Sequence, residues 1–213
     1  MRFKNYLVCL LLAAVFASPA GAEPRKSFDY YVMSLSWSPE FCDTHPKEKQ
    51  CSLGYGLVLH GLWPQYQRSY PEFCDSRPLP GQLVRKYADL YPSKGLIYHE
   101  WEKHGTCSGL APGEYLQLSE TLKQRIKTPP ALQNLAKPLR TDTKQLTQFV
   151  VAANPGLAAD AVAISCTGKQ RYLEEIYVCY DSSGAKAISC AEDVQKKSLK
   201  SCGKSGIVVR NIR

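Results

Sequence analysis

The sequence predicts an α+β fold in which an antiparallel β-sheet has helices packed to one side. Residues 28–37, 161–166, 172–180 and 207–212 are rich in aromatic and β-branched side chains, and 53–62 alternates around Val58 and His60, as strands do. Residues 82–91, 98–106, 114–127 and 141–153 carry helical apolar spacing or helix-capping residues. Strands and helices do not alternate as βαβ units, so a parallel sheet is disfavoured.

The ends of several elements are also marked. Ser38-Pro39 should end the first strand, and Trp63-Pro64 the second. Gly105 can close the helix over 98–106. The polar segments 44–50 and 192–205 have cysteines nearby, and we expect both to be tethered loops.

Residues 1–22 have the features of a secretory signal peptide. Arg2 and Lys4 precede an apolar run at 7–17, and Ala20-Gly21-Ala22 supplies the small residues of a cleavage site. The alternative, a membrane anchor, needs about 20 apolar residues, more than this run has. We therefore expect cleavage after Ala22, a single domain over 23–213, no membrane span, and export to the periplasm or the medium.

Cysteine content and charge narrow the class further. Of nine cysteines, Cys9 leaves with the signal, and an even number in an exported chain predicts four disulfides. Spacing alone leaves 105 pairings open. No C-x-x-C pair is present, which argues against zinc and thioredoxin-like sites. The formal net charge of +8, or +6 without Arg2 and Lys4, suits a nucleic acid, a membrane surface or an acidic polysaccharide.

Three of the four histidines fall in two short segments. His60 lies in LHGLWPQ at 59–65, and His99 and His104 lie in HEWEKHGTC at 99–107. Histidine changes charge near neutral pH, so two of them can act together as an acid and a base. The fourth, His45, lies in a charged loop, where we expect no specific role.

A helix over the second segment would gather chemically useful groups on one face. His99, Glu100, Lys103 and His104 fall within an arc of about 140°. Cations and hydrogen-bond donors beside a base suit a phosphoryl centre. The alternative, ordinary surface charge on a short helix, is disfavoured by the second histidine segment.

Metal binding and aromatic packing are the remaining alternatives. A zinc helix uses H-E-x-x-H, whereas His99 and His104 are five residues apart and Lys103 would repel a dication. We therefore expect no metal and no cofactor. Trp63, three residues after His60, can stack on a base or pack in the core. Trp37 and Trp101 are expected in the core.

LHGLWPQ and HEWEKHGTC together resemble the two active-site segments of the ribonuclease T2 family, the acid, base-nonspecific ribonucleases. The likeness extends over most of the chain after residue 22, including Ser-Trp-Ser-Pro-x-Phe-Cys at 36–42 and four cysteines in the last third. It implies an α+β fold and a transfer reaction on single-stranded RNA. In that reaction the 2′-hydroxyl attacks its own phosphorus and leaves a 2′,3′-cyclic phosphate, which is then hydrolysed to a 3′-phosphate.

The resemblance also implies roles for individual residues. His104 corresponds to the base that takes the 2′-hydroxyl proton, and His60 to the acid that protonates the leaving oxygen. Glu100 and Lys103 correspond to stabilisers of the charged phosphorane. The implied binding residues are His99 for phosphate and Trp63 for a base. The implied disulfides are Cys42–Cys51, Cys74–Cys107, Cys166–Cys202 and Cys179–Cys190.

The chain departs from the family pattern in two places. Many members have Asp where this chain has Gln65, and many have Gln before the early Trp-Pro pattern, where this chain has Ser36 and an inserted Ser38. Both places concern base recognition, so we expect low base specificity, with Gln65 at the base edge.

We therefore expect a monomeric ribonuclease that cuts single-stranded RNA and leaves DNA uncut. Two other functions are alternatives. One is a basic exported module that binds nucleic acid or an anionic surface without catalysis. The presence of His60, Glu100, Lys103 and His104 argues against that module. The other is a metallohydrolase, which a chelator would inactivate.

Overall fold

The computed structural model describes residues 28–212, so the predicted signal segment and its cleavage site lie outside the described residues. One six-stranded sheet has the order β2–β1–β5–β6–β3, with β4 paired to β5. The strands are β1 (Tyr30–Trp37), β2 (Leu57–Gln65), β3 (Leu139–Thr141), β4 (Val162–Thr167), β5 (Tyr172–Asp181) and β6 (Ile207–Val209).

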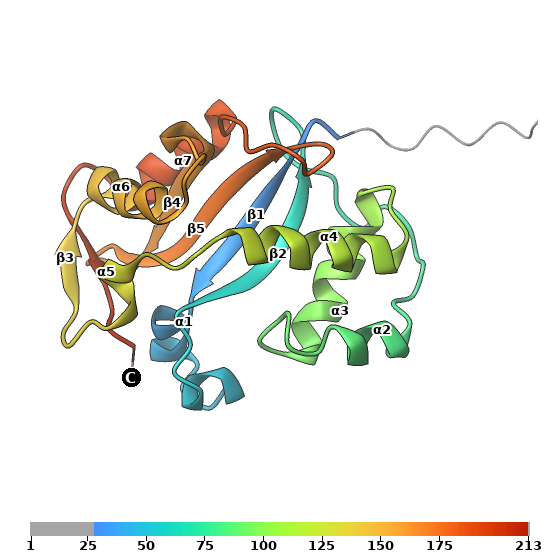
Figure 1. Ribbon diagram of the computed structural model, residues 1–213, viewed down its shortest axis with the longest axis horizontal. Helices are drawn as coiled ribbons and strands as arrows, with labels where there is room; N and C mark the ends of the chain where they lie inside the picture. Colours follow the sequence, from blue (N-terminus) through green and yellow to red (C-terminus); the bar gives the residue numbers. More distant parts are fainter. Residues whose placement is uncertain (1–27, 213) are drawn as a thin grey trace, which may run out of the picture.

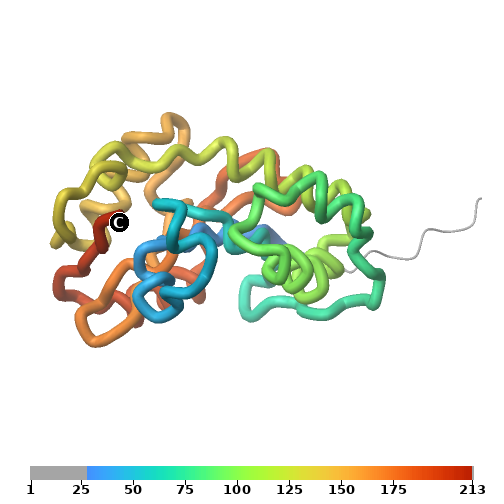
Figure 2. The backbone as a smooth tube through the Cα atoms, turned by 90° about the horizontal axis from the view of Figure 1, so that it is seen from below, coloured from blue at the N-terminus to red at the C-terminus, as the bar shows by residue number. Residues whose placement is uncertain are grey.

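Seven α-helices surround this sheet in the described part of the chain. They are α1 (Ser38–Thr44), α2 (Gly81–Lys86), α3 (Lys94–Lys103), α4 (Pro112–Arg125), α5 (Pro130–Gln133), α6 (Thr143–Ala153) and α7 (Glu192–Cys202). Short 3₁₀ turns occupy Lys49–Ser52, Gly105–Cys107 and Ala159–Ala161. Figures 1 and 2 both place α2 and α3 at one end of the molecule and α5 and β3 at the other.

The α+β prediction is confirmed, with one refinement to the sheet. β1 pairs antiparallel with β2 and β5, and β4 pairs antiparallel with β5. The exception is β6, which meets β5 in parallel at Tyr172 and Val208, so the sheet is mixed.

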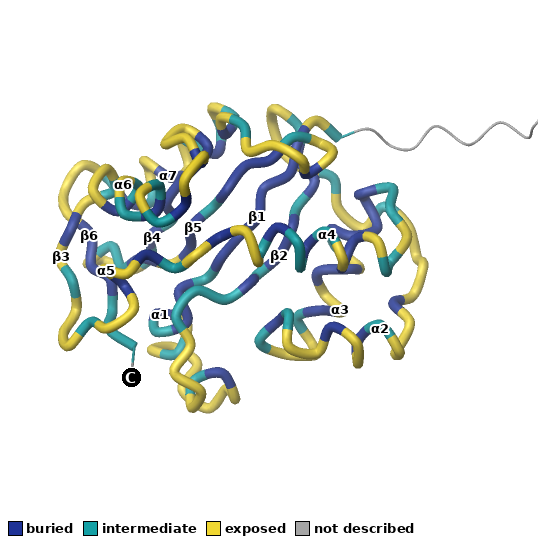
Figure 3. Tube along the Cα trace, in the orientation of Figure 1, coloured by how far each residue is buried: buried dark blue, intermediate teal, exposed yellow. Residues whose placement is uncertain are grey.

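The main core lies between one face of the sheet and the helices that cross it. β1 contributes Tyr31, Met33, Leu35 and Trp37 to this core, and α4 and α6 contribute apolar residues such as Leu122 and Leu146. Figure 1 shows α4 crossing in front of β1 and β2. Figure 3 shows β1 and β5 buried along most of their length, while the helices expose their outer sides. Trp37 and Trp101 are fully buried, as predicted.

The predicted end of β1 is confirmed, whereas the boundaries of β2 and of the helix over 98–106 differ from the prediction for local reasons. β2 continues through Pro64 to Gln65, because β2 is an edge strand and proline costs no ladder hydrogen bond there. Ser38-Pro39 ends β1 but also begins α1, since proline suits the first turn of a helix. The helix predicted at 98–106 begins earlier, at Lys94, because the Ser93 side chain caps the Leu96 amide.

Residues 192–202, predicted as part of a loop, form α7. This helix covers the free edge of β4 (Figure 1). The Ser198 hydroxyl accepts from the Ile164 amide at 3.1 Å and donates to its carbonyl at 2.6 Å, and Ser201 accepts from the Cys166 amide at 3.1 Å. Its serines thus satisfy edge groups that would otherwise need another strand.

Four disulfides join the described residues, and their pairing is the one that the family resemblance implies. They are Cys42–Cys51, Cys74–Cys107, Cys166–Cys202 and Cys179–Cys190. Cys74–Cys107 ties the loop after β2 to the turn after α3, and Cys166–Cys202 ties α7 to β4. The protein is therefore suited to an oxidising compartment. Among residues 28–212, the helices are too short or too polar to cross a membrane.

Candidate active site

All the residues predicted to act on RNA line one cavity of about 400 Å³. The cavity lies over the sheet face opposite the main core, between α3 and α7. It is lined by His60, Trp63 and Gln65 from β2 and by His99, Glu100, Lys103 and His104 from α3 and its end. Its volume lies at the small end of the ~300–1,000 Å³ typical of ligand pockets.

A β-bulge in β2 turns His60 toward this cavity. Ser34 pairs with Gly61 and Leu35 with Leu59, so His60 is the extra residue opposite β1. In a regular strand His60 and Trp63, three residues apart, would face opposite sides. The bulge shifts the alternation, and both side chains line the cavity while Leu59 and Leu62 remain in the core.

Two glycines in the motifs permit the close packing that builds the site. A Cβ on Gly61 would lie 1.8 Å from the Glu100 carboxylate, and one on Gly105 would lie 2.4 Å from the Trp101 ring. Any side chain at either position would push β2 or α4 away from α3. Gly105 was predicted to close a helix; the structure places it after that helix, in the turn that packs on Trp101 and Tyr115.

His60 is held by Glu175, which sequence reasoning missed. His60 Nδ1 donates to Glu175, a β5 residue whose side chain is only 10% exposed. The same carboxylate accepts from Ser36 at 3.0 Å and from Tyr177 at 2.7 Å. Burial opposes a charge on His60, but the hydrogen bond and charge of Glu175, with the charges of Glu100 and Glu174, raise the His60 pKa above its usual value. His60 therefore favours the protonated form.

Glu100 lies almost fully buried beneath His60. Its Oε2 accepts from the Trp63 indole at 2.7 Å, and its Oε1 lies 3.6 Å from His60 Nε2 and has no hydrogen bond among the described residues. Burial raises the Glu100 pKa to about 7, against the charge of His60 and the Trp63 hydrogen bond. Below neutral pH this carboxyl can carry a proton and donate it to an anion.

His104 has the opposite character to His60. It is 5% exposed, and its Nδ1 is buried without a partner in the described structure. Burial, with the charges of Lys103, His99 and His60, lowers the His104 pKa to about 3. The two histidines thus differ in protonation over a wide range of pH, which is the arrangement that an acid and a base require.

Cationic and aromatic groups surround this pair. Lys103 Nζ lies 3.9 Å from Glu72 and 5.9 Å from the centre of the Tyr70 ring, at the rim of the cavity. Trp63 lies 5.2 Å from His60 and 5.3 Å from His104 between ring centres. Gln65 is 6% exposed and donates from Nε2 to the Pro64 carbonyl at 3.1 Å. Tyr70 and Tyr177 also line the cavity and were not singled out from the sequence.

A second cavity, of about 470 Å³, adjoins the first on the other side of His60. It shares His60 and His99 with the first cavity. His45 lies in its wall, stacked on Phe41 at 4.4 Å between ring centres, although we expected no specific role for this residue. A group bound at His60 therefore has a cavity on either side.

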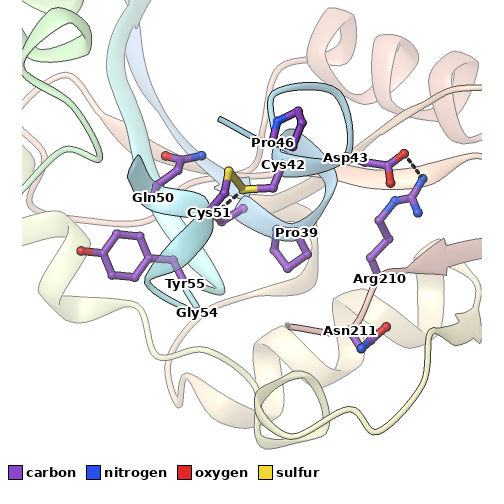
Figure 4. Close-up of a pocket in the computed structure, with 11 residues that line it drawn as sticks. Pro39, Cys42, Asp43, Pro46, Gln50, Cys51, Gly54, Tyr55, Arg210 and Asn211 are labelled. Atoms are coloured by element: carbon purple, nitrogen blue, oxygen red, sulfur yellow. Dashed lines mark hydrogen bonds and ion pairs between the residues drawn. A yellow bond between two sulfur atoms is a disulfide. The ribbon is translucent and has the colours of Figure 1, made fainter. Parts of the chain in front are cut away.

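A further cavity, of about 280 Å³, lies beside the Cys42–Cys51 disulfide and shares Gln50 with the second cavity (Figure 4). The basic group that lines it, Arg210, is already paired with Glu40 and, at 2.7 Å, with Asp43. Among the described residues that line it there is no unpaired cation, and none of them was predicted to act on RNA. Within residues 28–212, no cluster of three His, Cys, Asp or Glu side chains has the arrangement of a metal site.

Comparison with known proteins connects the site to a family. The Ribonuclease T2 family profile matches residues 28–190. A ribonuclease from Aeromonas hydrophila is 40% identical over 97% of both chains, and ribonuclease I of Escherichia coli is 26% identical over 88% of both. The structure of ribonuclease MC1 from bitter gourd seeds is similar, with a TM-score of 0.64 and 21% identity over 76% of this chain and 94% of that one.

Proposed function

The chain belongs to the Ribonuclease T2 family and is an endoribonuclease, and we propose that it cleaves single-stranded RNA with His104 as base and His60 as acid. The observation that carries this proposal is the opposite perturbation of the two histidines in one cavity. His104 takes the proton of the 2′-hydroxyl as that oxygen bonds to phosphorus. His60 gives its proton to the 5′-oxygen as the P–O bond breaks.

The products of this step are a 2′,3′-cyclic phosphate and a free 5′-hydroxyl. Water can then attack the cyclic phosphate with the two histidines in exchanged roles, which leaves a 3′-phosphate. DNA lacks the 2′-hydroxyl, so this route leaves DNA uncut. The residues supply both proton transfers, and we propose that no metal takes part.

Glu100, Lys103 and His99 supply charge stabilisation in this proposal. An ionised Glu100 would repel a phosphate, whereas the protonated form donates a hydrogen bond to a phosphorane oxygen. The raised Glu100 pKa supports that form at acid pH. Lys103 and His99 line the same cavity, where the charge of Lys103 balances the negative oxygens and His99 binds the phosphate.

In this proposal each of the two adjoining cavities holds a nucleotide, one on either side of the scissile phosphate. Trp63 offers a stacking surface in the first, beside Gln65 and Tyr70. The Phe41–His45 stack lies in the wall of the second. Stacking selects little among bases, which supports low base specificity.

Glu175 acts as a positioning residue in this proposal. Glu175 lies 115 residues from His60 along the chain, and its hydrogen bond holds a proton on His60 Nδ1 while Nε2 lies on the side of Glu100. Ser36 and Tyr177 in turn hold the carboxylate.

The decisive experiment identifies the product ends. RNA is digested in excess EDTA, and the ends are analysed by mass spectrometry. Cyclic or 3′-phosphate ends are expected. Loss of cleavage in EDTA, or 5′-phosphate ends, would overturn the proposed chemistry. A protein that binds RNA and leaves it intact would instead be a non-catalytic module. We also propose export through residues 1–22, tested by the N-terminus of the secreted protein, expected at Glu23.

A further inference from the structure

The cavity has a wall that the catalytic proposal does not use. Opposite α3, it is lined by Val194, Lys197, Ser198 and Ser201 of α7. This helix lies beyond the part of the chain that matches the family profile, which ends at residue 190. Lys197 is a cation that lines the same cavity as the histidines. It belongs to a helix that the family profile does not cover.

Positive charge continues from this wall along the surface. Lys197 and Lys200 are three residues apart in α7, so they are neighbours on the helix surface. The β4–β5 turn lies beside the end of α7, because Arg171 donates to Ser205. We call Lys197, Lys200 and Arg171 the α7 basic strip.

Few carboxylates of α7 itself and of the residues directly after it oppose this strip. Segment 192–205 holds four lysines and two acidic residues, both in the first turn of α7. Lys196 pairs with Glu192 at 2.7 Å, and Lys197 with Asp193 at 3.7 Å. The Lys197 side chain is 68% exposed, and exposed pairs of this kind are weak. A phosphate can therefore compete for Lys197, while no ion pair engages Lys200 in the described structure.

The course of an RNA strand links the strip to the site. An internal nucleotide carries a phosphate at either end of its sugar. When one phosphate lies at His60 and His104 and the nucleotide fills the 400 Å³ cavity, its other phosphate must leave on another side. The α7 wall is a side of the cavity that offers a cation.

We propose that the α7 basic strip is a binding site for the phosphates of the RNA strand that extend beyond the nucleotide in the cavity. The proposal rests on the proposed ribonuclease function. It makes the enzyme favour longer strands over the shortest cleavable substrate, because a dinucleoside monophosphate has no phosphate to place on the strip.

The test compares substrates of different length. Two variants are tested: Lys197→Gln alone, and Lys197→Gln together with Lys200→Gln. The control is Lys86→Gln on α2, at the other end of the molecule (Figure 1). For each, kcat/KM is measured on a dinucleoside monophosphate and on the same pair within a twelve-nucleotide strand. In the double variant, kcat/KM should fall by a factor at least five times larger on the strand than on the dinucleoside monophosphate, mainly because KM rises. The control should change neither value.

A salt titration gives an independent readout. Each phosphate contact to a single strand contributes about 0.7 to the slope of log affinity against log salt, so the double variant should lose about 0.7 to 1.4. Strand affinity is measured by fluorescence anisotropy on the His104→Ala background, which should cleave about 10²- to 10⁴-fold more slowly, so that the strand stays intact during the measurement. Equal losses of kcat/KM on both substrates, or an unchanged salt slope, would overturn the proposed role of the α7 basic strip. A wild type that binds the strand through the strip and cleaves neither substrate would overturn the ribonuclease mechanism alone.

Discussion

Replacing Glu175 by Gln should move the alkaline limb of the pH–rate profile to lower pH. The proposed acid, His60, must carry a proton, so kcat/KM falls as pH rises through the His60 pKa. Glu175 holds that pKa above its usual value, mainly through a hydrogen bond against the cost of burial. The substitution keeps the shape of the side chain and removes its charge.

The size of the shift follows from the hydrogen bond. A bond to a charged group contributes about 1.5–3 kcal/mol, and one pKa unit corresponds to about 1.4 kcal/mol. The His60 side chain is 35% exposed, so water screens part of this interaction and the lower end applies. We expect a shift of about one unit. Glu175 also raises the Glu100 pKa, so its loss moves that group in the same direction.

The assay is kcat/KM on a dinucleoside monophosphate from about pH 3 to 9, which reports the free enzyme. The matched control is Glu174→Gln, the same change at an exposed neighbour that is not hydrogen-bonded to His60. The control should shift the limb much less. Circular dichroism establishes that both variants fold. An alkaline limb that stays in place, or moves to higher pH, would refute the role assigned to Glu175.

Three further predictions follow from the site. Changing His60 or His104 to Ala should each lower kcat/KM by about 10²- to 10⁴-fold, and the double variant should fall short of the product because both serve one step; a near-normal rate for either would contradict its role. Gln65→Asp should favour purines with an amino group by about tenfold across a dinucleotide panel, because a carboxylate only accepts hydrogen bonds and binds more strongly than an amide; a wild type already hundreds-fold selective would place specificity elsewhere. Reduction should unfold the protein at 37 °C in a circular dichroism melt, because four disulfides of about 2–4 kcal/mol each rival a domain's stability of about 5–15 kcal/mol; two or more free thiols in the secreted protein would contradict the framework.

The grouping of the catalytic residues could be predicted from the sequence because the residues of each segment are close along the chain. His99, Glu100 and Lys103 share one side of α3 through helical spacing alone, and they line one cavity with His104, which follows the end of the helix. The placement of Trp37 and Trp101 in the core likewise followed from their surroundings.

Features that depend on pairing between distant segments could not be predicted in this way. Glu175 lies 115 residues from His60, in a strand whose neighbouring Glu174 is exposed, and nothing local distinguishes the two carboxylates. α7 has so many lysines and serines that its polar composition resembles a loop, yet its serines bond to the β4 edge. His45 lies in the wall of the second cavity because it follows α1 and stacks on Phe41, which the sequence around it does not reveal.

The bulge at His60 makes the length of β2 as important as its composition. Deleting one residue between Leu59 and Leu62 would restore regular alternation and turn either the histidine or the tryptophan to the other face of the sheet. The spacing of this segment is therefore as restricted as the identities of His60 and Gly61. Relatives that retain the chemistry should therefore have no insertion or deletion in this segment.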